Sequence, residues 1–383
     1  MNFEFSDEQN LLREQALGFL GEHCPYSAVR AILDGDAPYD EKLWKQIAEL
    51  GWTAVVIPEA HGGLGLSYLE LSVIAEELGR AVAPVPFSSS VYLATEAILM
   101  AGSEAQKEKW LPKLATGDAI GAFALGEGPG QPRPEKLATV ATANGISGVK
   151  IPVADGDIAD FAVVVARSDT GDGASLFLAE LGDVSRESVG TLDPTRSHAQ
   201  ITFEDSAPEP LGADGEGWTT TQRLLDRAAV LFAWEQVGGA NAALEMAKAY
   251  ALERYAFGRP IASYQAIKHK LAQAYVKNTL ARANCYYGAW ALSTDADELP
   301  TAAATARVSA TQAYYYASKE NIQTHGGMGF TWEFDCQFHY RRAKLLSVNI
   351  GSEATWQDKL ISAIERERDG SAVARDSAGA ESL

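Results

Sequence analysis

Two short groups of residues in the C-terminal half of the chain have the types and spacing of a site for an anionic ligand. An arginine side chain can donate to two phosphate oxygens at once. Paired glycines let backbone N–H groups approach an anionic or polar ligand closely. By residue type alone, Arg254 is read as a solvated charge on a helix, and only a match of the whole ordered set to a known family pattern would make it a binding-site residue. The set comprises Arg254, Phe257, Gln265, Gln323, Gly326 and Gly327.

Composition restricts the class of protein. The chain has 383 residues, enough for two or three domains, and a formal net charge of −19. This charge argues against nucleic acid or an anionic membrane surface as the main partner. Cys24, Cys285 and Cys336 are scattered, without a CxxC pair, and are read as reduced thiols in the cytoplasm. The sequence shows no cluster of metal ligands, no signal peptide and no membrane-spanning run.

The hydrophobic pattern changes twice along the chain. Residues 1–118 have helical spacing, beginning with a Ser6–Gln9 capping box. Residues 119–212 contain short apolar runs between turn residues, which is typical of an all-β domain. Residues 213–368 are helical again, and 369–383 form a small, polar tail expected to be disordered. Helices are expected over 219–253, 263–292 and 302–321, and within 354–367. The pattern predicts an α+β multidomain protein, and a β-barrel between two helical domains is one natural solution.

From Phe3 to about Leu360 the chain resembles the acyl-CoA dehydrogenases. The N-terminal resemblance is carried by the loop Pro58–Gly65, by Glu76-Glu77-Leu78-Gly79, and by the stretch from Gly102 to Gly117. The resemblance implies an N-terminal helical domain, a central β-barrel and a C-terminal four-helix bundle. It also implies FAD as cofactor, an acyl-CoA thioester as substrate and an electron-transfer flavoprotein as electron acceptor.

The ligand-binding set described above matches this family's cofactor motifs, Arg-x-x-Phe-Gly…Gln and Gln-x-x-Gly-Gly. In the family these groups hold the ADP half of FAD and reach a neighbouring subunit. The resemblance therefore implies that Arg254 and Gln265 contact pyrophosphate and ribityl oxygens. Gln323 and the Gly326–Gly327 turn would hold the adenosine end, with Phe257 beside the cofactor. His325 and His61 are given no catalytic role.

The catalytic base of the family is absent from both of its known positions. The reaction requires a carboxylate that removes the α-proton of the thioester. Most members carry a glutamate directly before a glycine, and this position is Ile350 here. Other members carry the base on a long helix, two residues after an aspartate resembling Asp226, and this position is Ala228.

The part of the family pattern that holds the flavin ring also differs. Gly126 replaces a threonine whose hydroxyl group hydrogen-bonds to the flavin. In the stretch from Lys150 to Gly156, Pro152 stands in place of a tryptophan and Ala154 in place of a threonine. The catalytic base and the residues that would contact a flavin ring in this chain's own site are lost. The residues that would contact FAD bound by a neighbouring subunit remain.

This asymmetry resembles the base-lacking subunit of bacterial heteromeric, α2β2 acyl-CoA dehydrogenases, several of which act on CoA thioesters of steroid side chains or rings. We therefore expect a subunit that completes the FAD site of a base-bearing partner subunit in a heterotetramer. Two alternatives stay open. One is a self-sufficient homotetramer with a relocated base, for which Glu353 and Glu127 are candidates. The other is a non-enzymatic scaffold without FAD.

Overall fold

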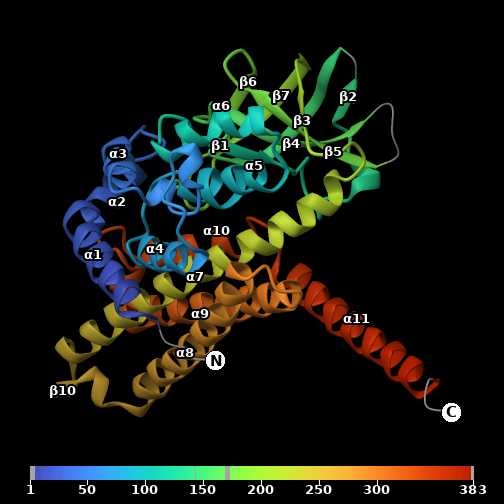
Figure 1. Cartoon of the computed structure of the whole chain (residues 1–383). Coiled ribbons are helices and arrows are strands. Elements are labelled where there is room, and N and C mark those ends of the chain that lie inside the picture. Colours follow the sequence, from blue (N-terminus) through green and yellow to red (C-terminus); the bar gives the residue numbers. More distant parts are fainter. Residues whose placement is uncertain (1–4, 143, 169–172, 381–383) are drawn as a thin grey trace.

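The computed structural model describes residues 5–142, 144–168 and 173–380, with side chains as far as Arg366. Phe3, where the resemblance begins, and the last three residues of the expected tail lie outside this part. The described chain is helical, then β, then helical, so the predicted mixed architecture is confirmed. In Figure 1 the sheet lies above and the long C-terminal helices lie below, with helix α7 between them. The exact domain boundaries stay predictions.

Capping residues begin several of the N-terminal helices. Ser6, Ser67 and Ser103 each accept a backbone N–H, and the side chain three residues later bonds back to the serine N–H. The segment before α5 is a π-helix, Ser88–Thr95, a wide turn that is frequent at functional sites. The α-helices of this part are α1 (Asp7–His23), α2 (Tyr26–Asp34), α3 (Glu41–Glu49), α4 (Tyr68–Arg80), α5 (Glu96–Ala101) and α6 (Glu104–Ala115).

The central strands form one sheet in the order β6-β7-β3-β2-β4-β5-β8, and β1 pairs in parallel with β4. Strand β6 pairs with β7, and β8 with β5, but no pairing joins β6 to β8 in the described chain. Closure of a barrel requires such pairing. The closed β-barrel that we expected is therefore corrected to an open sheet. The strands are β1 (Gly121–Ala124), β2 (Val140–Thr142), β3 (Gly145–Ala154), β4 (Phe161–Ser168), β5 (Ala174–Glu180), β6 (Ser185–Ser188), β7 (His198–Ser206) and β8 (Glu209–Leu211).

Long helices make up the C-terminal part, and α7, α8 and α9 pack on one another. Helix α10 was not expected from the sequence. Helix α11 continues to Ala380, which differs from the disorder expected for 369–383; its alanine-rich sequence has no proline that would end a helix. The elements are α7 (Gly217–Glu253), β9 (Tyr255–Ala256), β10 (Arg259–Pro260), α8 (Gln265–Ser293), α9 (Leu299–His325), α10 (Cys336–Leu346) and α11 (Glu353–Ala380).

Glycines allow α4 and α7 to cross in close contact. A Cβ atom on Gly238 would lie 1.8 Å from the carbonyl oxygen of Glu76, and one on Gly79 would lie 1.9 Å from that of Glu235. Any larger residue would force the helices apart. This crossing fixes the N-terminal domain against α7 and places Glu235 in the interior.

Candidate functional site

A cavity of about 520 Å³ lies where the sheet meets the helices on either side of it. Its walls come from the π-helix, β1 and the loop after it, β3, β7, α7, and the segment that joins α10 to α11. Large apolar side chains make up much of the wall. Polar and charged side chains complete it, among them Ser88, Ser89, Asp155, Arg196, His198 and Lys359. This size and composition are typical of a site for a small organic molecule.

The two positions that the resemblance gives to the base have different surroundings. Ile350 lines the cavity and is half-buried. Ala228 is fully buried inside α7 and is absent from the cavity wall. The cavity therefore has an aliphatic side chain, which cannot accept a proton, at the place where the family pattern has a glutamate.

Neither of the carboxylates considered as a relocated base lines the cavity. Glu127 forms an ion pair with the buried Lys150, at 2.7 Å, and accepts backbone hydrogen bonds from Ala138 and Thr139. Burial alone would raise the pKa of Glu127, but the Lys150 and Ala138 hydrogen bonds outweigh it and lower the pKa. Glu353 is half-buried at the start of α11, where it accepts a hydrogen bond of 2.7 Å from Gln312. Both carboxylates therefore form their hydrogen bonds outside the cavity.

The structure identifies a carboxyl group that the sequence analysis missed. Asp155 is the only acidic residue in the described wall of the cavity. Its oxygens accept hydrogen bonds from the Ser89 and Ser197 hydroxyls. Burial raises the pKa of Asp155, and this outweighs the opposing effect of the Arg196 guanidinium. Its place in the altered stretch Lys150–Gly156 was a signal that could have drawn attention to it.

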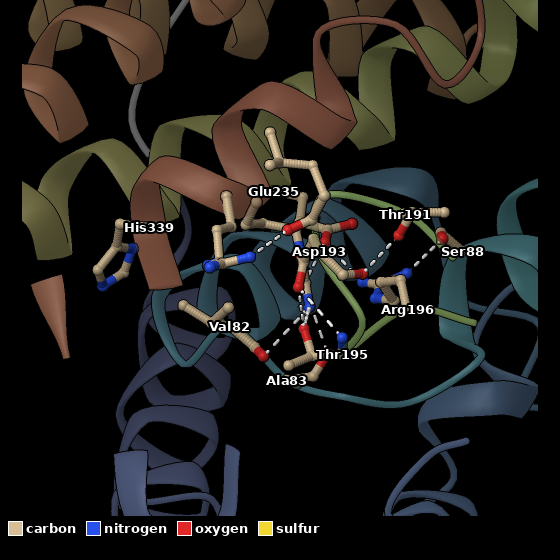
Figure 2. A network of polar contacts seen from close by, with 12 residues as sticks. Val82, Ala83, Ser88, Thr191, Asp193, Thr195, Arg196, Glu235 and His339 are labelled. Carbon is tan, nitrogen blue, oxygen red and sulfur yellow. Dashed lines mark hydrogen bonds and ion pairs between the residues drawn. The ribbon is translucent and has the colours of Figure 1, made fainter. Parts of the chain in front are cut away.

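A buried network of charges lies behind the polar wall (Figure 2). Arg196 donates to Ser88 Oγ and pairs with Glu235, both at 2.6 Å. Glu235 also pairs with Arg342 at 3.3 Å, and Arg342 pairs with Asp193 at 2.6 Å. The network joins the π-helix, the segment before β7, α7 and α10, so it fixes the surroundings of the cavity.

The predicted ligand-binding residues lie outside this cavity, at the far ends of α7 and α9. Arg254 caps α7, Gln265 begins α8, and Gln323 is in the last turn of α9; all three are exposed. Phe257 is 97% exposed, with the left-handed φ of 51° in the turn between β9 and β10. A Cβ atom at Gly326 or Gly327 would meet nothing within 4 Å, so the backbone there is open to a ligand.

Local contacts bring the two motifs together. The rings of Tyr250 and His325 stack with centroids 4.2 Å apart, which places the C-terminal ends of α7 and α9 side by side. The backbone N–H of Ile261 donates to the carbonyl oxygen of Arg254 at 2.8 Å, and this holds the approach to α8. His325 is buried and its Nδ1 is 2.9 Å from the Asn321 carbonyl oxygen, a structural role. His61 does not line the cavity.

Other kinds of site are not seen in the described residues. No group of three or more His, Cys, Asp and Glu residues there could hold a metal ion. Cys24, Cys285 and Cys336 are buried free thiols. Within the same residues, no helix is long and apolar enough to cross a lipid bilayer.

Comparisons with known proteins agree with the geometry. Two family models match, the acyl-CoA dehydrogenase N-terminal domain over residues 6–118 and the C-terminal domain over residues 215–363. Acyl-CoA dehydrogenase IpdE2 of Mycobacterium tuberculosis is 36% identical over 340 residues, covering 88% of this chain and 91% of the relative.

Two solved structures share nearly the whole fold. The Tcur3481-Tcur3483 steroid ACAD matches with a TM-score of 0.86 and 28% identity, over 95% of this chain and 99% of that chain. The ChsE4-ChsE5 complex of Mycobacterium tuberculosis matches with a TM-score of 0.86 and 25% identity, over the same shares. The chain belongs to the acyl-CoA dehydrogenase family, whose members are FAD-dependent oxidoreductases that act on acyl-CoA thioesters.

Proposed function

We propose that this chain is the half-site subunit of a heteromeric acyl-CoA dehydrogenase and completes the FAD site of a base-bearing partner subunit. The observation that carries the proposal is the separation of two sets of residues. The predicted ligand-binding set is exposed at the ends of α7 and α9, whereas the chain's own cavity has Ile350 at the base position. A cofactor bound by this set would therefore lie on the outer surface of the chain.

The residues present fit the ADP half of FAD and the ribityl chain next to it. The exposed Arg254 guanidinium would donate to pyrophosphate oxygens, and the Gln265 amide would hydrogen-bond to ribityl oxygens. The open backbone at Gly326 and Gly327, with Gln323, would hold the adenosine end. Phe257, with almost its whole ring exposed, would pack beside the cofactor. FAD, when bound, supplies the hydride acceptor of the reaction.

In this assignment the chain binds and orients FAD, and the partner subunit carries out proton transfer. The partner's carboxylate would remove the α-proton of an acyl-CoA thioester, and an electron-transfer flavoprotein would receive the electrons. The acyl group is proposed to be steroid-derived. This rests on likeness to a solved steroid ACAD. The ChsE4-ChsE5 complex supports an assembly of unlike subunits, proposed here to be a heterotetramer.

A self-sufficient enzyme is the second candidate, and Asp155 is the observation in its favour, because it is a buried carboxyl group in the cavity wall. Two serine hydroxyls already donate to its oxygens. These two bonds leave other lone pairs free, but Asp155 matches neither base position of the family, which are Ile350 and Ala228 in this chain. The half-site assignment therefore accounts for more of the structure.

A flavin absorbance spectrum at known protein concentration tests the proposal, on the chain alone and co-expressed with a base-bearing family member. Little FAD on the chain alone, and about one FAD per pair of unlike chains together, is the expected result. About one FAD per chain alone, bleached by an acyl-CoA, would overturn it.

A further inference from the structure

One side of helix α8 is apolar and stays exposed in the described chain. Tyr275 is 63% exposed, Val276 54% and Leu280 61%. The helical repeat places these side chains on one side of α8, whose other side packs on α7 and α9. Contiguous exposed apolar surface of this kind marks a contact with another protein. We call this surface the α8 face, and it consists of Ala272, Tyr275, Val276, Thr279, Leu280 and Ala283.

The surroundings of the α8 face are basic, although the whole chain has a net charge of −19. Residues 254–294 include six lysines and arginines and no aspartate or glutamate. Lys270 and Arg282 are paired with acidic side chains of α9 and α4. Lys268 and Lys277 are exposed on α8, and neither forms an ion pair with another described residue. Two cations therefore lie beside the apolar surface without an acidic partner from this part of the chain.

These charges argue against a second copy of this chain as the occupant of the α8 face. A two-fold contact joins the same surface of both copies, so α8 would meet α8. Because α8 carries basic and no acidic side chains, such a contact would bring like charges together, which weakens association. An apolar surface with acidic residues beside it is the better complement.

The α8 face continues from the predicted ligand-binding set. Gln265 is the first residue of α8, and Lys268 and Ala272 follow it on the same side of the helix. In Figure 1 this end of α8 and the adjoining β9–β10 hairpin lie at the lower edge of the molecule, away from the sheet. If Gln265 contacts FAD held by a base-bearing partner subunit, that subunit lies against the start of α8. The same protein can then extend along the helix.

We propose that the α8 face binds the base-bearing partner subunit, through an apolar surface that carries acidic residues opposite Lys268 and Lys277. This inference rests on the proposed half-site function and adds to it the contact surface and the charge of the partner. Apolar burial supplies affinity. The charges select the unlike chain over a second copy of this one.

The test is the dissociation of the complex between the full-length chain and a base-bearing family member, followed by sedimentation on dilution with excess FAD present. Leu280→Ser should weaken the complex about 10-fold, because it removes apolar contact. The double variant Lys268→Glu/Lys277→Glu should weaken it by about 10-fold or more at low salt. Added salt should weaken the wild-type complex more than the double-variant complex, because salt screens the attraction that the variant lacks.

Matched controls lie on helices of the N-terminal part. Leu17→Ser replaces an exposed leucine of α1, and Lys42→Glu/Lys45→Glu makes the same change of net charge on α3. Both should leave the complex unchanged. The melting temperature of the chain alone should be the same for Leu280→Ser and Leu17→Ser, because both side chains are exposed.

Three results would overturn the inference. Two are a Leu280→Ser complex as tight as that of Leu17→Ser, and a Lys268→Glu/Lys277→Glu complex as tight as that of Lys42→Glu/Lys45→Glu. The third is a homodimer of the chain alone that Leu280→Ser dissociates, which would assign the α8 face to a second copy. With about one FAD per pair of unlike chains, these results would leave the half-site function standing. A chain that holds one FAD by itself and forms no complex would defeat both.

Discussion

Tyr250 of α7 stacks on His325 of α9 with ring centroids 4.2 Å apart, and this contact joins two motifs separated by about seventy residues in the chain. Arg254 follows one ring by a single helical turn, and the Gly326–Gly327 turn follows the other directly. A ligand that spans both motifs therefore meets a surface held by packing within this chain.

Arg254→Ala should weaken FAD retention in the complex without altering the fold. The exposed guanidinium has no role in the core, and its loss would remove the hydrogen bonds that we propose it donates to pyrophosphate oxygens. We expect FAD affinity to fall by about 10-fold or more, measured by absorbance after dialysis, with an unchanged melting temperature. Arg223→Ala, at an exposed arginine of the same helix, is the control. Equal FAD content in the two variants would count against the assignment of Arg254.

Asp155→Asn should leave the dehydrogenase activity of the complex unchanged within about twofold. Asparagine has nearly the same shape and can still accept a hydrogen bond from Ser89 or Ser197. The measurement is kcat with an acyl-CoA substrate, and Glu353→Gln, at a half-buried position outside the cavity wall, is the parallel variant. A loss of 100-fold or more in Asp155→Asn alone would identify a base on this chain and favour the self-sufficient enzyme.

Arg342→Met should destabilise the chain strongly. The side chain is fully buried, and its removal leaves the Asp193 and Glu235 carboxylates with fewer partners. Breaking a buried pair from one side costs about 3–5 kcal/mol. Denaturant unfolding should show this loss, with Arg366→Met at an exposed position as the control. A loss below about 1 kcal/mol would show that the network contributes little to stability.

His339 should make the chain less stable as the pH falls below neutral. Burial, with Arg342 and Arg80 nearby, lowers the pKa of His339 to about 3. Its ring nitrogens contact the hydroxyls of Tyr26, at 2.6 Å, and Tyr314, at 3.1 Å. The folded state keeps the ring neutral, whereas the unfolded chain takes up a proton below about pH 6.5. The stability is therefore complete above pH 6.5 and is lost between pH 6.5 and 3, at up to about 1.4 kcal/mol per pH unit.

The matched variant is His339→Gln, which retains a hydrogen-bonding side chain but does not titrate. Other groups ionise in the same range, so the informative quantity is the difference in free energy of unfolding between the two proteins at each pH. This difference should shrink as the pH falls from 6.5. A constant difference would mean that His339 is not the group responsible.

The sequence by itself determined the order of helical and β segments, the Ser6 capping box and the extent of α7, α8 and α9 to within a few residues. These features follow from local spacing and capping chemistry, which act over a few residues. It also predicted the motifs at Arg254 and Gln323 and the loss of the base at Ile350. These predictions follow from comparing the residue types in this chain with those at the matching positions of the family's motifs.

Only the tertiary structure decided that the sheet stays open and which side chains contact one another. Whether β6 reaches β8 depends on sheet twist and on the short edge strands, which no local pattern records. Glu127 and Glu353 were reasonable carboxylates in the sequence, but long-range contacts direct them elsewhere. Asp155 and Arg196 both line the cavity because they flank Ala154 of β3 and His198 of β7, which are paired in the sheet. Burial then determines how their charges affect each other.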